Sequence, residues 1–118
     1  VARLVMDKET TRSLGGVVTV DHYVFDSTKL NNDLTELSIS SGGKVVLGEF
    51  GAPIPDIHGK MSEDEQSEWI DQTLGLIINN PNVIGISYWT NIGGSTGIWS
   101  SDNSPKKAVT ILTKYFKL

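Results

Sequence analysis

The sequence contains no cysteine among its 118 residues. This absence excludes a disulfide framework, a cysteine nucleophile and any metal site built on thiolates. Histidine is also scarce, because His22 and His58 are the only two and lie far apart, so we expect no metal centre. No run of about 18 apolar residues is present, and we therefore expect no membrane-spanning helix.

The sequence also has fewer basic than acidic residues. Ten Lys and Arg residues are scattered against 14 Asp and Glu, which leaves a net charge of −4 and argues against nucleic acid as the partner. No basic segment leads into an apolar one, so we expect no signal peptide, and the start at Val1 leads us to expect a piece of something longer. The length predicts one domain over residues 1–118.

Three segments have the composition of β-strands. Residues 17–23 (VVTVDHY) are β-branched and aromatic and follow a pair of glycines. Residues 44–50 (KVVLGEF) contain a continuous apolar run, which is typical of a strand covered on both faces. Residues 83–90 (VIGISYWT) form the third predicted strand.

Helical patterns alternate with these strands. The clearest begins at the capping box Ser62–Glu65, carries apolar residues at helical spacing and ends at Asn79-Asn80-Pro81. The other three are expected over 1–14 (ended by Gly15-Gly16), 28–40 and 105–117. This alternation predicts an α/β fold with three parallel strands. A complete eight-stranded barrel needs about 250 residues. The chain is therefore expected to form a small open sheet or part of a barrel completed elsewhere.

Reactive side chains are expected at the carboxyl ends of the parallel strands. Glu49 follows an apolar run and lies between glycines, which suits a carboxylate nucleophile or base, or a strand-end acid paired with a cation. Trp89 could stack on a sugar ring or pack in the core. Tyr23 could donate a hydrogen bond to Glu49 or be a half-buried strand residue, and in a regular strand His22 points away from it.

Several other readings have little support. The sequence has no Gly-x-Ser-x-Gly motif and no glycine fingerprint for phosphate binding. The acidic residues at 63–65 and Glu68 lie where a helix begins and are expected to favour its dipole and solvent. His58 is expected in a mobile loop.

Four segments resemble, in order and spacing, the C-terminal part of the (β/α)8-barrel glycoside hydrolases of clan A. They read VVLGEFGAP, SEDEQSEWIDQTL, VIGISYWTNIGG and GIWSSDNSPKKAV. The cellulase-like enzymes related to family 5 are the most similar in pattern, and the likeness covers about residues 17–117. It implies the last three βα units of the barrel, with strands six to eight in this chain.

The resemblance also implies roles for individual residues. Glu49 matches the nucleophile at the end of strand seven, and Trp89 matches the floor of the central sugar subsite. Tyr23 matches a tyrosine that contacts the nucleophile, with His22 beside it but shifted by one position from the family's histidine. Asn91 would contact a sugar hydroxyl. Gln66 matches a glutamine common in the seventh helix.

A retaining β-glycosidase acting on poly- or oligosaccharides is therefore the expected parent, without metal or organic cofactor. Its acid/base Glu, at the end of strand four, is expected outside this chain. The expected partners are a carbohydrate substrate and either the N-terminal part of the barrel or a second copy of the chain. A non-catalytic sugar-binding half-barrel and a purely structural fragment remain alternatives. The resemblance is compatible with secretion, whereas no targeting segment indicates a location.

Overall fold

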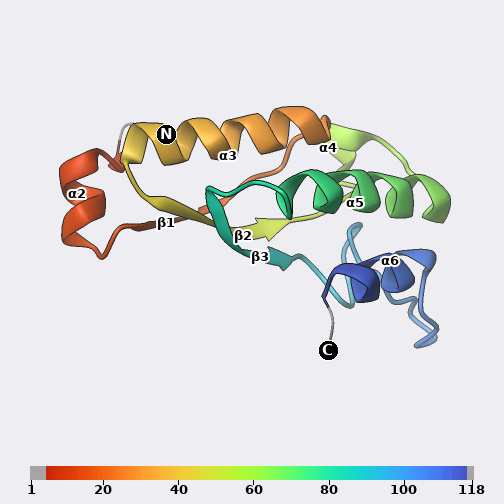
Figure 1. The fold of residues 1–118 in the computed structure, drawn as a ribbon. Coiled ribbons are helices and arrows are strands. Elements are labelled where there is room, and N and C mark those ends of the chain that lie inside the picture. Colours follow the sequence, from red (N-terminus) through yellow and green to blue (C-terminus); the bar gives the residue numbers. More distant parts are fainter. Residues whose placement is uncertain (1–4, 117–118) are drawn as a thin grey trace.

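The computed structural model describes residues 5–116. In this part of the chain, three parallel strands form one sheet in the order β1 (Val17–Asp21), β2 (Lys44–Phe50) and β3 (Val83–Tyr88). Helices α3 (Ser27–Ser41) and α5 (Glu63–Ile77) run along one side of the sheet (Figure 1). The predicted α/β fold, with helices alternating between parallel strands, is confirmed.

The core lies between the central strand β2 and helices α3 and α5. Val45 and Leu47 point toward these helices and are fully buried, whereas Val46 between them remains partly exposed. The prediction that this strand is covered on both faces is therefore not met within residues 5–116. Each large apolar side chain buried here stabilises the fold by about 1.5–3 kcal/mol. The helical side of the core consists of Leu30, Leu34, Leu37, Ile70, Leu74 and Ile77.

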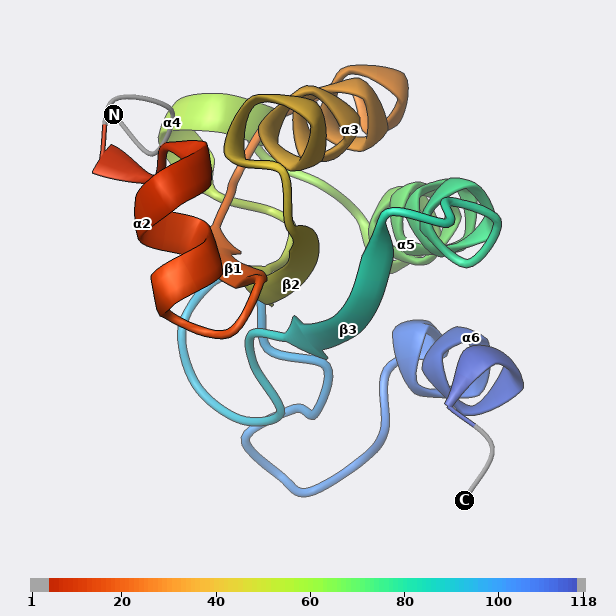
Figure 2. The same cartoon turned by 60° about the vertical axis from the view of Figure 1, so that its left-hand side comes forward.

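The helices wrap around the outside of the sheet. Turning the molecule shows α3, α5 and α6 (Lys107–Tyr115) following one another around it, with α2 (Lys8–Ser13) beside the start of β1 (Figure 2). The predicted capping box is confirmed, because the side chains of Ser62 and Glu65 each bond the other's backbone N–H at the start of α5. Among the described residues, no helix is long and apolar enough to cross a membrane.

Several predicted boundaries move. Strands β1 and β3 each end two residues earlier than expected. Helix α6 begins at Lys107 instead of Pro105, because Pro105 pairs with Trp99 in an antiparallel bridge. The first predicted helix is shorter, since the Asp7 side chain accepts a hydrogen bond from the Thr10 N–H (2.8 Å) and caps the helix there. Residues 1–4 of that prediction lie outside the described residues.

One short helix was not expected. Helix α4 (Pro55–His58) occupies the predicted loop, with Pro55 in its first turn. His58 is buried rather than mobile, and its ring packs edge-on against Trp69 with 5.1 Å between ring centroids. The expectation of a mobile His58 is therefore wrong.

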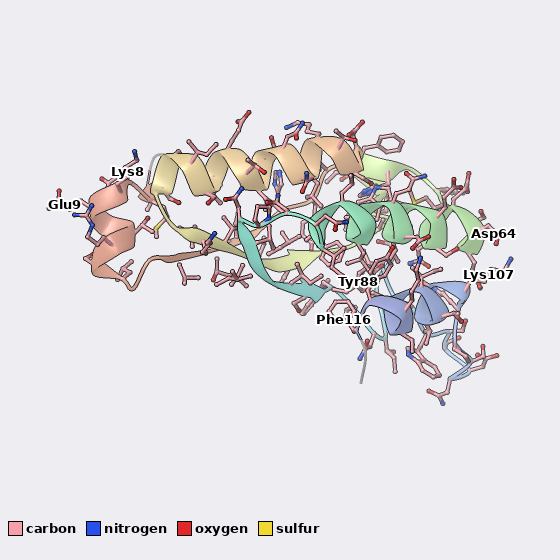
Figure 3. The ribbon with its side chains drawn as sticks, in the orientation of Figure 1. Lys8, Glu9, Asp64, Tyr88, Lys107 and Phe116 are labelled. Carbon is pink, nitrogen blue, oxygen red and sulfur yellow. The ribbon has the colours of Figure 1, made fainter. Side chains whose placement is uncertain are left out.

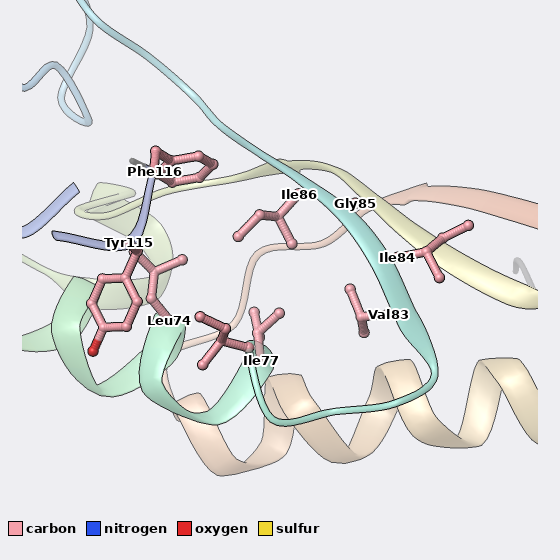
Figure 4. Close-up of a pocket in the computed structure, with 9 residues that line it drawn as sticks. Leu74, Ile77, Val83, Ile84, Gly85, Ile86, Tyr115 and Phe116 are labelled. Atoms are coloured by element: carbon pink, nitrogen blue, oxygen red, sulfur yellow. The ribbon is translucent and has the colours of Figure 1, made fainter. Parts of the chain in front are cut away.

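An apolar groove of about 260 Å³ runs beside β3, between α5 and α6 (Figure 4). Ile78 and Ile84 on its wall are 63% and 57% exposed. The strand β3 pairs only with β2, so its other edge is open within residues 5–116. The groove is lined by Leu74, Ile77, Ile78, Val83, Ile84, Gly85, Ile86, Tyr115 and Phe116.

Candidate active site

The candidate site lies where the three parallel strands end. The backbone continues the sheet pairing for one residue beyond β1 and β3, because the His22 N–H donates to the Glu49 carbonyl and the Trp89 N–H donates to the Phe50 carbonyl (both 2.9 Å). These two bonds place the segments after β1 and β3 on either side of the end of β2. We call this edge, formed by residues 21–23, 48–52 and 88–91, the rim.

Tyr23 and Glu49 meet at the rim. The Tyr23 hydroxyl donates a hydrogen bond to Glu49 Oε2 over 3.0 Å, from a residue 26 positions earlier in the sequence. Burial, together with the hydrogen bond to Glu49 and the charge of Glu49, raises the pKa of Tyr23 to about 12. The phenol is therefore a neutral donor at physiological pH, and it holds one carboxylate oxygen of Glu49 in place.

Glu49 has no cation as its partner in the described part of the chain. Ion pairs there join Lys29 to Asp33, Lys107 to Asp64, and Lys114 to Asp71. The alternative of a strand-end acid neutralised by a nearby cation therefore gains no support from residues 5–116. A half-buried carboxylate held by a phenol is chemically suited to act as a nucleophile.

Trp89 is exposed at the rim. Its side chain is 52% accessible to solvent, which speaks against the alternative of core packing within residues 5–116. Tyr88, immediately before it, is partly buried at the end of β3 (Figure 3). It packs edge-on against Phe50 with 5.4 Å between ring centroids. The chain thus presents an exposed indole immediately after a packed aromatic residue. The peptide bonds Ala52–Pro53 and Trp89–Thr90 are both cis.

His22 does not join Tyr23 and Glu49 through its side chain. Its Nε2 atom lies 2.8 Å from Asp33 Oδ2 on α3, and Lys29 contacts the same oxygen at 2.6 Å. His22 and Tyr23 lie beyond the end of β1, and their side chains contact different elements, His22 on α3 and Tyr23 at the end of β2. The side-chain contact that the structure shows for His22 is with helix α3, and its predicted substrate-binding role stays a prediction.

Asn91 lies in the loop that follows β3. Its carbonyl accepts hydrogen bonds from the N–H groups of Ile98 (3.0 Å) and Trp99 (2.9 Å), while the residue is exposed. The contact predicted for its side chain with a sugar remains a prediction. Beside this loop lies a hollow of about 410 Å³, lined by Ile92, Gly93, Gly94, Trp99, Ser100, Ser101 and Lys106.

His58 is held by hydrogen bonds below the rim. Its Nδ1 atom accepts from the Ile54 N–H (2.9 Å), and its Nε2 atom lies 3.1 Å from the Val24 carbonyl, to which it donates. Burial lowers the pKa of His58, which favours the neutral ring that this pattern requires. No group of three or more His, Asp or Glu residues within 5–116 could hold a metal ion.

Gln66, which the resemblance matches to a glutamine of the seventh helix, has a structural role that the sequence did not predict. Gln66 lies near the start of α5, is 2% exposed, and donates to the carbonyls of Ala52 (2.8 Å) and Thr96 (3.1 Å). A polar residue on the apolar side of an amphipathic helix was the signal that could have identified it.

No protein-family model and no curated protein matches this sequence. Solved structures do match. An endo-beta-1,3-glucanase of glycoside hydrolase family 128 (subgroup I) from Amycolatopsis mediterranei superposes with a TM-score of 0.73 at 11% identity, covering 92% of this chain and 49% of the other. A family 128 (subgroup VII) oligosaccharide-binding protein from Trichoderma gamsii has a TM-score of 0.70 at 14% identity, with coverages of 85% and 40%.

A beta-glucuronidase from Bifidobacterium dentium is similar over 84% of this chain and 20% of its own, with a TM-score of 0.61 and 26% identity. The chain thus spans about half or less of the length of each of these structures. These structural neighbours are barrel-type glycoside hydrolases and a related oligosaccharide-binding protein. The comparison shows the fold: three parallel βα units of the kind that make up part of such a barrel.

Proposed function

We propose that this chain is the C-terminal segment of a retaining β-glycosidase that hydrolyses poly- or oligosaccharides. The observation that carries the proposal is the 3.0 Å hydrogen bond from Tyr23 to Glu49, at the carboxyl ends of adjacent parallel strands and one strand away from the exposed Trp89. Active sites of α/β barrels lie at this end of the strands. The finer resemblance to cellulase-like, family 5-related enzymes belongs to the same proposal.

In this mechanism Glu49 attacks the anomeric carbon and forms a glycosyl-enzyme intermediate, while the leaving group receives a proton. Tyr23 holds the attacking carboxylate, and Trp89 stacks on the sugar. Retaining hydrolysis needs a second carboxyl group about 5–5.5 Å from the first, to act as acid and then as base. We place that group in the part of the barrel outside this chain, at the end of strand four.

The partner in this proposal is the remaining, N-terminal part of a barrel. Two features support it: the open edge of β3 beside an apolar groove, and neighbours at least about twice as long as this chain. Residues 1–118 would then be one partial barrel domain.

The test is the substitution Glu49→Gln in the complete enzyme, assayed with aryl β-glycosides. We expect turnover to fall by about three orders of magnitude or more with the circular dichroism spectrum unchanged, because the amide cannot act as the nucleophile. Glu68→Gln, on the exposed side of α5, is the matched control and should retain turnover. Near-normal turnover of Glu49→Gln would refute the assignment.

A second candidate is a non-catalytic sugar-binding half-barrel. The exposed Trp89 favours it, as does the similarity to a structure described as an oligosaccharide-binding protein. Calorimetric titration of the chain with laminarihexaose, run beside the aryl-glycoside assay, separates the two candidates. Binding without turnover in the complete protein supports the second candidate.

A further inference from the structure

Gln66 joins two loops that lie far apart in the sequence. Its Nε2 atom donates to the carbonyl of Ala52, which follows β2, and to the carbonyl of Thr96, which follows β3. All three residues are buried, with exposed fractions of 2% or less for Gln66 and Ala52 and 3% for Thr96. Because both partners are carbonyl oxygens, which only accept, the amide must present its NH2 group to them. Both of its hydrogens are thereby used.

Tyr88 completes the same cluster. Its hydroxyl lies 3.0 Å from the Ala52 carbonyl, 2.9 Å from the Thr96 carbonyl and 3.4 Å from Gln66 Nε2. Its one hydrogen can serve either carbonyl. Burial raises the pKa of Tyr88 to about 12, so this donor is retained at physiological pH. Gln66 and Tyr88 therefore satisfy two buried carbonyls from two loops.

Both loops carry residues of the candidate active site. Ala52 comes three positions after Glu49, and Thr96 comes seven positions after Trp89. The segments also touch directly, because a Cβ atom added at Gly51 would overlap the Trp89 carbonyl oxygen and lie 3.3 Å from Thr96 Cβ. A change in the Gln66 cluster would thus be transmitted to the placement of Glu49 relative to Trp89.

We propose that Gln66, assisted by Tyr88, is a positioning residue that sets where Trp89 stands relative to Glu49. Its consequence for sugar binding rests on the proposed function. The positioning itself does not, since it concerns the geometry of the chain alone. Without Gln66, the two buried carbonyls share only the single hydrogen of the Tyr88 hydroxyl, and the link between the two loops is weakened.

The test uses the whole chain labelled with 5-fluorotryptophan. The three tryptophans give three fluorine NMR signals, which Trp→Phe variants assign. Gln66→Met keeps the size of the side chain but removes both donors, and Tyr88→Phe keeps the ring but removes the hydroxyl. Thr73→Val is the matched control. Thr73 lies on the same helix, and its buried hydroxyl is 2.7 Å from the hydroxyl of Ser27, so this variant removes a buried hydrogen bond that does not reach the rim.

We expect the Trp89 signal to shift or broaden in Gln66→Met and Tyr88→Phe but not in Thr73→Val. We also expect the affinity for laminarihexaose to fall about tenfold in Gln66→Met. A Trp89 signal that moves no more than in Thr73→Val overturns the proposal, and if Gln66→Met does not fold, Tyr88→Phe alone decides. The Trp89 signal decides the role of Gln66 whether or not the unsubstituted chain binds an oligosaccharide. The proposed function is tested separately, by Glu49→Gln in the complete enzyme, so failure of the one is distinguishable from failure of the other.

Discussion

At the scale of single residues, the pair Tyr23–Glu49 couples a phenol to a carboxylate. The hydrogen bond has its full strength only while the phenol keeps its proton and the carboxylate is ionised. The same contact that orients Glu49 therefore makes the Tyr23 proton harder to remove. This coupling can be measured from the tyrosine side, without substrate and without the rest of a barrel.

We predict that Tyr23 ionises with a midpoint of about 12 and that Glu49→Gln lowers this pKa only in part, because burial, its largest cause, remains. The folded pKa lies above the unfolded one, chiefly through burial and also through the hydrogen bond and charge of Glu49. The stability linked to the protonated phenol is therefore complete below pH 10.0 and is lost as the pH rises through about 12. Phenolate absorbance during a pH titration measures the midpoint.

Tyr88 also has a pKa raised to about 12, so the titration needs an assignment. Tyr23→Phe supplies it by removing one component of the absorbance change. If the component lost in Tyr23→Phe already titrates near 10.0 in the unsubstituted chain, the hydrogen bond to Glu49 is absent in solution.

The residues of this pair could be found from sequence because strand-end positions follow from local composition. A polar residue after an apolar run, in neighbouring parallel strands, is enough to bring Tyr23 and Glu49 together. The contact of His22 with Asp33 could not be predicted from the sequence, because it depends on how helix α3 is oriented against the sheet. The sequence thus predicts which residues form the rim, but not the direction of every side chain there.

At the scale of elements, β2 and the capped start of α5 were predictable because their signals are local. Helix α4 was not, since only four residues form it and its stability depends on distant partners. His58 is covered by Trp69 from α5 and lies 6.0 Å from Phe25 in ring-centroid distance, and neither neighbour is close in sequence. The proline and glycine residues of this segment predict a loop, whereas the structure forms a short, packed helix there.

The close approach of the two rim segments predicts contrasting effects for two glycines. Gly51→Ala should lower the free energy of unfolding by about 1–3 kcal/mol, because the added methyl group meets the backbone carbonyl of Trp89. Gly75→Ala lies inside helix α5, where the new methyl group lies 3.4 Å from the Tyr115 hydroxyl. It should raise the free energy of unfolding by up to about 1 kcal/mol.

Urea denaturation followed by tryptophan fluorescence measures both variants, and Gly75→Ala controls for the general effect of an added methyl group. Equal stabilities for Gly51→Ala and the unsubstituted chain would show that the two segments are farther apart than the structure places them. The spacing on which the role of Gln66 depends would then be wrong as well.

At the scale of the whole molecule, the sheet is unfinished within residues 5–116. Strand β1 pairs only with β2 on one side, and β3 pairs only with β2 on the other. Open strand edges next to apolar side chains favour pairing with another chain. The groove beside β3 adds exposed Ile78 and Ile84 to that edge, so it is the surface on which we place the rest of the barrel.

We predict that the chain alone self-associates as its concentration rises, and that Ile84→Lys weakens this association. A lysine at the groove places a charge where an apolar partner would have to remove it from water. Ile39→Lys is the control, because Ile39 is 68% exposed on α3 and does not line the groove. Sedimentation velocity measures the mass of the species present.

Adding the N-terminal part of the barrel should replace this self-association by a one-to-one complex, with a gain of ellipticity and the same sensitivity to Ile84→Lys. The chain could instead remain a monomer with cooperative unfolding at every concentration and not bind the N-terminal part. That result would contradict the proposal that the groove beside β3 contacts the rest of the barrel. Association that Ile39→Lys weakens as much as Ile84→Lys would locate the contact on the helices. The groove beside β3 would then have no part in completing the sheet.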